Sequence, residues 1–393
     1  RTKMSISADV LRAYRSIDEK TVDELLAQEI KNNNKKIVVL DDDPTGVQTV
    51  HDISVYTGWD ADSLREAFAE ENNLFYILTN SRGFTEEQTK AAHLEIADAV
   101  DRAAKEASRD YIFLSRSDST LRGHYPLETR LLKEYYERNT GVKLDGEILC
   151  PFFKEGGRYT IGNVHYVKYG DELVPAHETE FAKDKTFGYT AENLPDYVEE
   201  KTAGEYKAKD VISISLEDIR SMDFDKIESQ LMSAKNFNKI IVNAIDYSDI
   251  KVFAVALFRA MNAGKMFMFR TAAALVKVMG GVSDMPLLAR SDMIVNDTEN
   301  GGIIVVGSHT AKTTSQLECL KEIADIEFIE LDANLVRDEE GFANEVDRCL
   351  ALEGEYIKSG KTVCCYTSRS LVVANTGDKE DELRLSVRIS DAV

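Results

Sequence analysis

The sequence predicts an α/β protein of two domains, each with a mostly parallel sheet flanked by helices, and three observations support this prediction. Short apolar, β-branched segments alternate with longer segments of helical periodicity, as in a parallel sheet covered by helices. The alternation is interrupted twice, at residues 151–186 and again near residues 283–302. With 393 residues, the chain is too long for one ordinary compact core.

The first domain is expected to span residues 1–285 and to contain six strands. The expected strands are 36–40, 74–79, 111–115, 147–150, 211–215 and 239–243. Between them, segments such as 85–107 carry apolar residues at helical spacing beside charged faces, which predicts crossover helices. The interruption at 151–186 contains an alternating stretch, 163–174, and therefore predicts an antiparallel ribbon.

The second domain is expected to span residues 300–393 and to repeat the alternation of strand and helix. Strands are predicted at 303–306, 326–331 and 362–367, with helices at 313–323 and 341–359 between them. Residues 380–393 show a further helical pattern. The polar stretch that ends in Asn300-Gly301-Gly302 marks the boundary between the domains.

Composition excludes several classes of function. The chain has 48 basic and 69 acidic side chains, and the net charge of −21 disfavours binding to nucleic acid or anionic lipid. We find no apolar run of the roughly 20 residues that a membrane span needs, and no apolar signal core at the N-terminus. The five cysteines are scattered without CxxC spacing, so neither a disulfide framework nor a zinc site is indicated. These features predict a cytoplasmic protein.

The end of the first predicted strand is acidic. Asp41-Asp42-Asp43-Pro44-Thr45-Gly46 follows an apolar strand directly, at the strand end where open α/β sheets bind ligands. Adjacent carboxylates raise at least one pKa unless cations or donors offset them, which suits a general base or a magnesium site. A simpler alternative is that Asp43 or Thr45 only caps a helix.

A second alternative for the acidic strand end is a different enzyme. The spacing Asp41-x-Asp43-x-Thr45 also fits the nucleophile motif of haloacid-dehalogenase-type phosphatases, in which Asp41 would be the covalent nucleophile. Such an enzyme needs a second acidic pair after a strand. The segment from Asp292 to Asp297 imitates that pair poorly.

Two further strand ends carry basic and hydroxyl groups. Arg82 follows the second strand, and a run from Arg116 to Arg122 follows the third. Arginine binds carboxylates in bidentate fashion, while serine and aspartate recognise hydroxyls, so the three strand ends together predict a receptor for a polyhydroxy acid. The candidate substrate-binding residues are Asp42, Arg82, Arg116, Ser117, Asp118, Ser119, Arg122 and Arg158. The alternatives are surface ion pairs for the arginines and a helix cap for Asp118 and Ser119.

The second domain offers one candidate turn for a phosphate. Gly307, Ser308 and Thr310 join the strand 303–306 to the following helix, where glycine permits close backbone approach and hydroxyls can meet an anion. The alternative is a glycine turn with a Ser or Thr cap. No Walker motif or GxGxxG is present.

Together these segments resemble the four-carbon acid sugar kinase family. The motifs that carry the resemblance are DDDPTG at 41–46, TNSR at 79–82, RSDSTLRGH at 116–124, PFFKEGGRYTIGNVHYV at 151–167, RTAA at 270–273 and VVGSHTAKTTSQL at 305–317. The resemblance implies an acid-sugar-binding N-terminal domain, a nucleotide-binding C-terminal domain and an active site in the cleft between them. The glycine-rich segments that complete the family's nucleotide site are not found before Val393.

The resemblance also implies an activity and its partners. We expect an ATP-dependent kinase, a transferase that phosphorylates a hydroxyl of a four-carbon sugar acid such as threonate, erythronate or 3-oxo-tetronate. Asp43 or Asp42 would accept the proton, with ATP and Mg²⁺ as cofactors and the metal ligands unassigned. A homodimer is compatible with this expectation. The alternatives are the phosphatase and a non-catalytic acid-sugar-binding protein.

Overall fold

The computed structural model describes residues 4–294, 296, 298–374 and 376–393. The chain divides into two compact units, Arg1–Met285 and Pro286–Val393. Each unit contains a parallel sheet flanked by helices, so the predicted fold class is confirmed. The location of the active site between the domains stays a prediction.

The first unit is built on an eight-stranded sheet in which every neighbouring pair is parallel. The strands lie in the order β10 (Ile212–Ile214), β11 (Asn238–Val242), β6 (Gly146–Cys150), β12 (Phe267–Thr271), β5 (Tyr111–Arg116), β2 (Lys36–Asp41), β4 (Leu74–Leu78) and β3 (Val55–Tyr56). Its inner strands are buried along their whole length because helices cover both faces.

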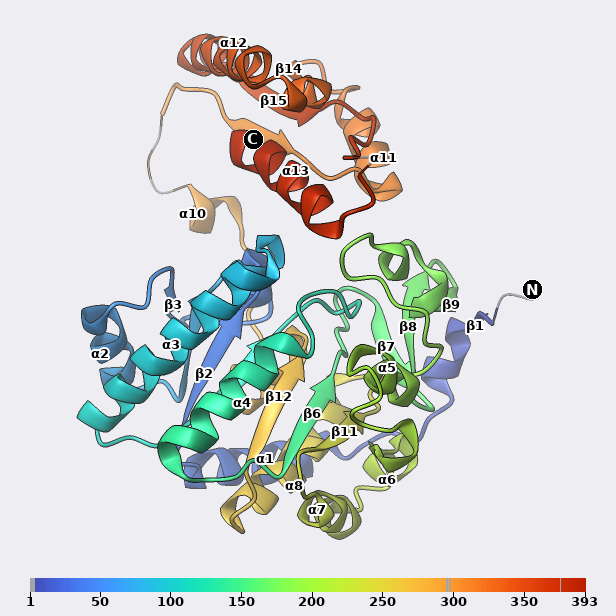
Figure 1. Cartoon of the computed structure of the whole chain (residues 1–393). Helices are drawn as coiled ribbons and strands as arrows, with labels where there is room; N and C mark the ends of the chain where they lie inside the picture. Colours follow the sequence, from blue (N-terminus) through green and yellow to red (C-terminus); the bar gives the residue numbers. More distant parts are fainter. Residues whose placement is uncertain (1–3, 295, 297, 375) are drawn as a thin grey trace. The chain divides into compact units, whose positions relative to one another are not determined.

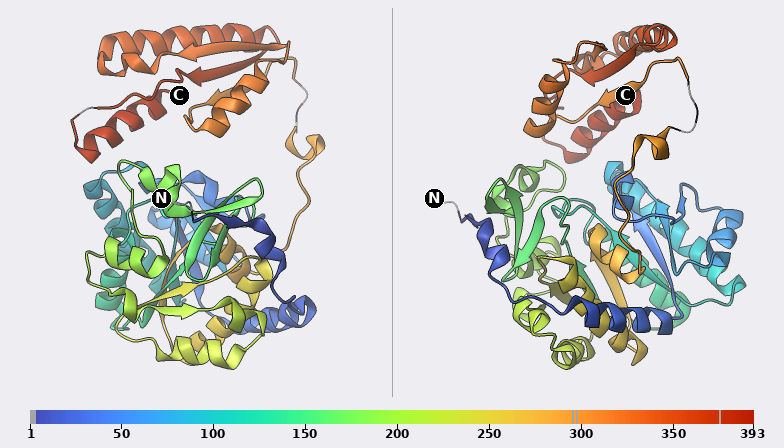
Figure 2. Two further views of the ribbon diagram at one scale, coloured as in Figure 1. Left: turned by 90° about the vertical axis from the view of Figure 1, so that its right-hand side faces the viewer. Right: turned by 180° about the vertical axis from the view of Figure 1, so that it is seen from behind.

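The helices of the first unit form two layers around this sheet. Figure 1 shows α3 (Glu86–Glu106) and α4 (Leu127–Thr140) in front of the sheet, and Figure 2 shows α1 (Glu19–Asn32) on the opposite side. The remaining helices are α2 (Ala61–Ala69), α5 (Leu194–Lys201), α6 (Leu216–Arg220), α7 (Phe224–Ser233), α8 (Tyr247–Asn262) and α9 (Ala273–Met279). The short helix α10 (Arg290–Met293) lies just beyond this unit.

The interruption at 151–186 is an antiparallel sheet, as its alternating pattern predicts. Its four strands lie in the order β1 (Ile6–Ser7), β9 (Glu172–Pro175), β8 (Val164–Tyr169) and β7 (Arg158–Ile161). The pairing of β1 joins the N-terminal segment to this sheet. Residue Arg158 therefore lies at the start of a strand and is not part of a free loop.

All six strands predicted for the first unit are present, and no end differs from the prediction by more than one residue. The sequence prediction did not include β12 or β3. Strand β12 follows α8, in which most residues are buried, and β12 is itself buried along its whole length, so neither element shows the alternation of polarity that separates a strand from a helix.

The second unit has a three-stranded parallel sheet in the order β13 (Ile303–Val306), β15 (Thr362–Thr367) and β14 (Ile326–Leu331). Besides the short α10, its α-helices in the described residues are α11 (Ala311–Leu320), α12 (Glu339–Lys358) and α13 (Lys379–Ala392). The predicted strands of this unit match residue for residue. Its core is small and includes Val336, Phe342, Cys349 and Val363.

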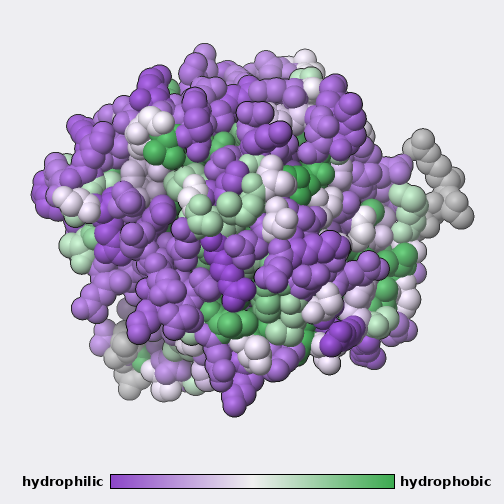
Figure 3. Space-filling view, turned by 90° about the horizontal axis from the view of Figure 1, so that it is seen from below, coloured by the Kyte–Doolittle hydropathy of each residue, from purple (hydrophilic) through white to green (hydrophobic). Residues whose placement is uncertain are grey.

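The surface agrees with the high content of charged residues. Hydrophilic residues cover most of the face seen from below, with small hydrophobic areas between them (Figure 3). In the parts of the chain that the structure describes, we find no helix with the length and apolar character that crossing a membrane requires.

Candidate functional site

The register of two central strands places the acidic strand end beside an arginine. Strands β2 and β5 pair Asp41 with Arg116, and both side chains are buried, with 0% and 4% exposed. The Nε of Arg116 donates to Oδ1 of Asp41, and its Nη2 donates to Oδ1 of Asp43 at 2.7 Å. The sequence prediction that these strand ends share one edge therefore holds in the structure.

A second arginine closes the cluster from the neighbouring strand. Arg82 lies in a short 3₁₀ helix (Ser81–Gly83) just after β4. Its Nε and Nη2 donate to the two oxygens of Asp42 at 3.1 and 2.7 Å, and its Nη1 lies 2.5 Å from Oδ2 of Asp43. Three carboxylates and two guanidinium groups thus form one cluster, which we call the strand-end cluster: Asp41, Asp42, Asp43, Arg82 and Arg116.

The three carboxyl groups of the cluster differ in their acidity. Burial raises the pKa of Asp41 to about 7, although Arg116 opposes the shift. Burial also raises the pKa of Asp42, against the charges of Arg82 and Arg116. Burial acts in the same direction on Asp43, but the two arginines and the Thr45 hydroxyl outweigh it and lower its pKa. Asp43 keeps 18% of its side chain exposed, so it is an ionised carboxylate that a ligand can reach.

The turn after the cluster confirms that Asp43 also acts as a cap. Its Oδ1 accepts hydrogen bonds from the backbone N–H and the hydroxyl of Thr45, at 2.9 and 2.5 Å, at the start of a 3₁₀ helix (Pro44–Val47). In that helix, a β-carbon on Gly46 would overlap the Nε of Arg116 and the carboxylate of Asp41. The glycine lets the backbone pack directly against the buried ion pair.

Burial of Asp41 bears on the phosphatase alternative. A covalent nucleophile needs an accessible oxygen, whereas Asp41 is completely buried between Arg116 and the backbone of Gly46. Asp297, half of the acidic pair that this alternative would use, lies outside the described residues. The geometry therefore disfavours Asp41 as a nucleophile.

The serine- and aspartate-rich run forms a tight loop after β5. Asp118 accepts hydrogen bonds from the Thr120 hydroxyl and from Nε of Arg122, the latter at 2.7 Å. Burial opposes its ionisation, yet Arg82 and Arg122 hold its pKa well below the ordinary value. Ser117 donates its backbone N–H to the carbonyl of Thr271 at 2.8 Å. The next helix, α4, begins at Leu127 without Asp118 or Ser119 as its cap, so the capping alternative is wrong for these two residues.

Arg122 and Arg158 come together over an aromatic ring. Their guanidinium carbons lie 5.0 and 5.3 Å from the centre of the Phe181 ring. Burial lowers the pKa of Arg158, and its Nε is buried without a hydrogen-bond partner. The loop of Asp118 and the antiparallel sheet therefore meet at two stacked arginines.

The histidines near these motifs bind backbone carbonyls. His165 contacts the carbonyl of Ser119 at 2.6 Å and the Thr160 hydroxyl at 2.9 Å, and burial lowers its pKa to about 4. His124 contacts the carbonyl of Phe84 at 2.8 Å. Both therefore fix loops around the cluster.

The sequence analysis missed one buried ion pair beside the cluster. Arg270, at the end of β12, is 7% exposed and donates from Nη1 to Glu128 Oε2 and to the Ser115 hydroxyl, the latter at 2.9 Å. Glu128 also accepts from the Ser81 hydroxyl at 2.5 Å, and Arg270 helps to lower its pKa to about 2 against the effect of burial. The sequence feature that could have revealed Arg270 is its position at the end of an apolar Phe-Met-Phe segment, but the sequence prediction did not include that segment as a strand.

The carboxylates of the cluster do not fit a Mg²⁺ site. Ligand atoms of Asp41, Asp42 and Asp43 lie within 4.8 Å of one another, as a cation site would require. However, Arg82 and Arg116 already neutralise these oxygens, and two of the three carboxylates are buried. Magnesium prefers carboxylates and water molecules that it can approach in octahedral geometry. We therefore derive no step through a metal at this cluster.

The candidate phosphate turn of the second unit is more open. Thr310 caps α11 by accepting from the backbone N–H of Thr313 at 3.3 Å, which confirms the capping alternative. The hydroxyl of Ser308 accepts from the Thr310 backbone N–H at 3.3 Å. A β-carbon on Gly307 would meet nothing within 4 Å. The turn therefore leaves room for a ligand near the N-terminus of the helix.

A cation lies against this turn that the sequence analysis did not single out. Arg369 follows β15 and donates from Nη2 to the carbonyl of Ser308 and to the Thr314 hydroxyl, the latter at 2.8 Å. Within the part of the chain that the structure describes, its Nε and Nη1 are buried and have no hydrogen-bond partner. Arginine at a helix N-terminus suits an anionic group such as a phosphate.

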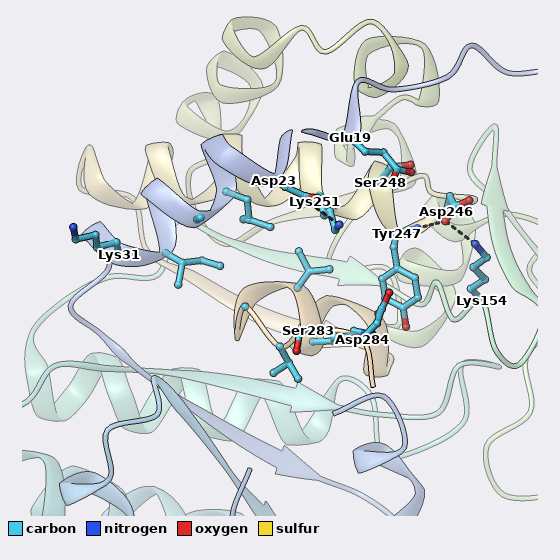
Figure 4. Close-up of a pocket in the computed structure, with 17 residues that line it drawn as sticks. Glu19, Asp23, Lys31, Lys154, Asp246, Tyr247, Ser248, Lys251, Ser283 and Asp284 are labelled. Atoms are coloured by element: carbon cyan, nitrogen blue, oxygen red, sulfur yellow. Dashed lines mark hydrogen bonds and ion pairs between the residues drawn. The ribbon is translucent and has the colours of Figure 1, made fainter. Parts of the chain in front are cut away.

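The largest cavity described lies elsewhere in the first unit. It has a volume of about 760 Å³ and is lined by α1, the start of α8 and residues 277–284 (Figure 4). Three of its lysines pair with aspartates: Lys154 with Asp246 at 2.9 Å, Lys251 with Asp23 at 2.6 Å, and Lys277 with Asp284. It contains none of the predicted site residues, and six of its eight charged side chains form these three ion pairs. We therefore place the candidate site at the strand-end cluster.

Comparison with known proteins gives two family matches. The family described as "Sugar-binding N-terminal domain" matches residues 37–279, and "Nucleotide-binding C-terminal domain" matches residues 303–393. The first match contains the strand-end cluster and the second contains the turn at Ser308. No curated protein matches the chain.

Several solved structures resemble the chain at low identity. A domain of unknown function (DUF1537) from Bordetella bronchiseptica, a domain-swapped dimer with bound citrate, is 16% identical, with 91% of this chain and 79% of that chain covered and a TM-score of 0.46. Haemophilus influenzae protein HI1011 is 15% identical, with 90% and 81% covered and a TM-score of 0.47. A proposed tRNA synthase from Salmonella typhimurium LT2 is 11% identical, with 91% and 80% covered and a TM-score of 0.53. The Salmonella likeness supports the fold alone.

Proposed function

Since the chain belongs to the family that joins a sugar-binding N-terminal domain to a nucleotide-binding C-terminal domain, consistent with four-carbon acid sugar kinases, we propose that it is an ATP-dependent kinase of four-carbon sugar acids. The observation that carries the proposal is the strand-end cluster. It places one partly exposed, ionised carboxylate, Asp43, among buried arginines at the carboxyl end of a parallel sheet.

In the proposed reaction, an oxygen of a substrate hydroxyl attacks the γ-phosphorus of ATP. The bond between that phosphorus and the β,γ-bridging oxygen breaks, ADP leaves, and Asp43 accepts the hydroxyl proton. Asp43 has a lowered pKa and is a weak base, which suits a loose transition state in which the proton leaves late. Its role is mainly to orient the hydroxyl.

The other cluster residues hold Asp43 and the ligand in place. Arg82 and Arg116 fix both oxygens of Asp43, and Asp42 fixes Arg82 from the buried side. The run Ser117, Asp118 and Ser119, with Arg122 and Arg158, would contact the hydroxyls and the acid group. Positioning of this kind supplies most of the rate in phosphoryl transfer.

The second unit would bind the nucleotide. We assign the phosphates of ATP to the turn of Gly307, Ser308 and Thr310, with Arg369 as an additional cation. Backbone N–H groups at a helix N-terminus and a guanidinium group both favour phosphate oxygens. ATP would arrive as its magnesium complex.

A coupled ADP-release assay tests the proposal. Purified full-length chain is given ATP, Mg²⁺ and, in turn, threonate, erythronate and 3-oxo-tetronate. We expect turnover with at least one acid. Asp43→Asn should lower kcat by about 10²- to 10⁴-fold while circular dichroism shows an unchanged fold.

Two other results would contradict the kinase. Phosphate release from a phosphorylated substrate without ATP would favour the phosphatase. Calorimetric binding of sugar acids without any turnover or nucleotide binding would favour a non-catalytic acid-sugar-binding protein.

A further inference from the structure

Every side-chain nitrogen of the two arginines in the strand-end cluster already contacts a carboxylate or carbonyl oxygen. Arg82 uses all three of its nitrogens on Asp42 and Asp43. Arg116 uses Nε on Asp41, Nη1 on the carbonyl of Ser117 and Nη2 on Asp43. An acid that took over these same contacts would have to displace a buried carboxylate. A cation with an unpartnered nitrogen is therefore better placed to recognise the acid.

Arg270 is a buried cation beside the cluster that keeps an unpartnered nitrogen. Strand β12 lies between β5 and β6 and pairs Arg270 with Ser115 and Leu149, so its guanidinium group lies at the centre of the sheet edge. Its Nη1 is held by Glu128 and Ser115, whereas its Nη2 is buried and has no hydrogen-bond partner among the described residues. A buried guanidinium N–H without an acceptor costs free energy comparable to a lost hydrogen bond.

The backbone of Gly123 packs closely against Nη2. A β-carbon on Gly123 would lie 2.7 Å from Nη2 and 3.1 Å from Oδ2 of Asp42, and Gly123 has a positive φ of 119°, so glycine is required at this position. Arg270 also lines a cavity of about 20 Å³ together with Ser117 and Asp118. This volume is about that of one water-sized group.

We propose that Arg270 binds the substrate: its Nη2 donates a hydrogen bond to one carboxylate oxygen of the sugar acid in the cavity beside Ser117 and Asp118. The inference rests on the proposed function for its substrate class. A carboxylate fits better than a hydroxyl because a charge-assisted bond gains most from a buried guanidinium group. Glu128 holds the other side of the group and fixes its direction.

The proposal makes Arg270 a determinant of specificity for acids over neutral polyols. Threonate and threitol, or erythronate and erythritol, differ only at the acid carbon, so each pair reports on the contact with Nη2. The variant Arg270→Gln removes the charge and the free donor. Arg270→Lys keeps the charge beside Glu128 but lacks the second arm of the fork.

Calorimetric titration of the full chain with these four compounds tests the inference. We expect Arg270→Gln to weaken binding of the acids about 10- to 100-fold and to leave binding of the polyols within about threefold of wild type. Arg270→Lys should retain the fold, and its affinity for the acids should still be about tenfold lower than that of wild type. Arg220→Gln is the matched control, because Arg220 is also a mostly buried arginine paired with an aspartate, Asp249, but is not part of the cluster. It should lower stability without changing either affinity.

Other outcomes separate this inference from the proposed function. Equal losses for acids and polyols, or unchanged acid binding in both Arg270 variants, would overturn the inference and indicate that Nη2 holds only a water molecule. Acid-selective loss in a protein that releases no ADP would support the inference and contradict the kinase. Wild-type protein that binds none of the acids would overturn both.

Discussion

The two candidate ligand sites are built in opposite ways. The strand-end cluster of the first unit is buried, and each of its charged groups has at least one partner of opposite charge. The Gly307–Thr310 turn of the second unit is exposed, held by hydroxyl contacts of 3.3–3.4 Å, and has Arg369 as its nearby cation. In the first site, the groups proposed to bind the ligand also stabilise the fold. In the second site, a side-chain group can be removed without unfolding the unit.

This difference suits the two ligands that we propose. A small sugar acid offers few atoms, so its site must be rigid and preorganised to discriminate. A nucleotide brings a large, highly charged chain of phosphates, which an exposed helix N-terminus and an arginine can accept with less precision. The contrast predicts that equivalent substitutions have unequal effects in the two units.

Removing the central arginine should have the largest effect. Arg116→Ala leaves Asp41 buried without its partner, and we expect a loss of about 3–5 kcal/mol in the free energy of unfolding. Urea unfolding followed by fluorescence of Trp59, the single tryptophan, reports on the first unit. The control is Arg65→Ala, which removes an exposed ion pair with Asp62 in the same unit and should cost less than about 1 kcal/mol. Similar losses in both variants would show that the cluster is not a special source of stability.

A pair of glycine substitutions tests the contrast directly. Gly46→Ala places a methyl group against the Asp41–Arg116 pair, and we expect destabilisation by about 1–3 kcal/mol from overpacking. Gly307→Ala meets open space and should change stability by less than about 0.5 kcal/mol. Thermal unfolding monitored by circular dichroism measures both. Equal effects would contradict the difference in packing between the two sites.

The sequence predicted the sheet better than the details of the site. Parallel order and helix cover follow from the alternation of short and long segments, and the three acidic and basic strand ends share an edge because parallel strands end on one side. The prediction that these three strand ends lie together at one edge of the sheet was therefore correct. The sequence could not tell that Arg82 and Arg116 would neutralise the aspartates, because the strand register that pairs Asp41 with Arg116 is a tertiary property.

Other features were beyond the sequence for different physical reasons. Arg270 was given no role because α8 and β12 are both buried, and burial on all sides removes the periodicity that separates strand from helix. Its partner Glu128 lies in the first turn of α4. An acidic residue at this position is expected to complement the helix dipole, so the sequence does not mark Glu128 as the partner of a buried arginine. The free donor on Arg270 depends on which nitrogens find partners in three dimensions.

The pKa of Asp41 predicts a smaller, pH-dependent effect in the first unit. Burial raises this pKa from the ordinary value to about 7, so the folded chain binds more protons than the unfolded chain between about pH 4 and 7. The contribution of this group to stability is present below the unfolded pKa and is lost as the pH rises through the folded pKa.

Asp41→Asn should therefore show a different pH profile of stability. We expect the stability of wild type relative to the variant to fall by on the order of 1 kcal/mol between pH 5 and pH 8, measured by urea unfolding at each pH. A stability difference that does not change with pH would show that Asp41 keeps an ordinary pKa or stays ionised through its contact with Arg116.

The smallest effect is expected at the turn of the second unit. Ser308→Ala removes a hydroxyl that contacts the hydroxyl and the backbone N–H of the neighbouring Thr310 at 3.4 and 3.3 Å, so the fold should lose less than about 0.5 kcal/mol. If the hydroxyl contacts a phosphate, the variant should raise the KM for ATP up to about tenfold with the KM for the sugar acid unchanged.

The control is Thr314→Ala, which removes a hydroxyl held by Arg369. It separates the loss of an ATP contact from the loosening of Arg369. A rise in the KM for ATP with Thr314→Ala and none with Ser308→Ala would assign the nucleotide to Arg369, and the contrast between the two sites would then rest on a single cation in the second unit.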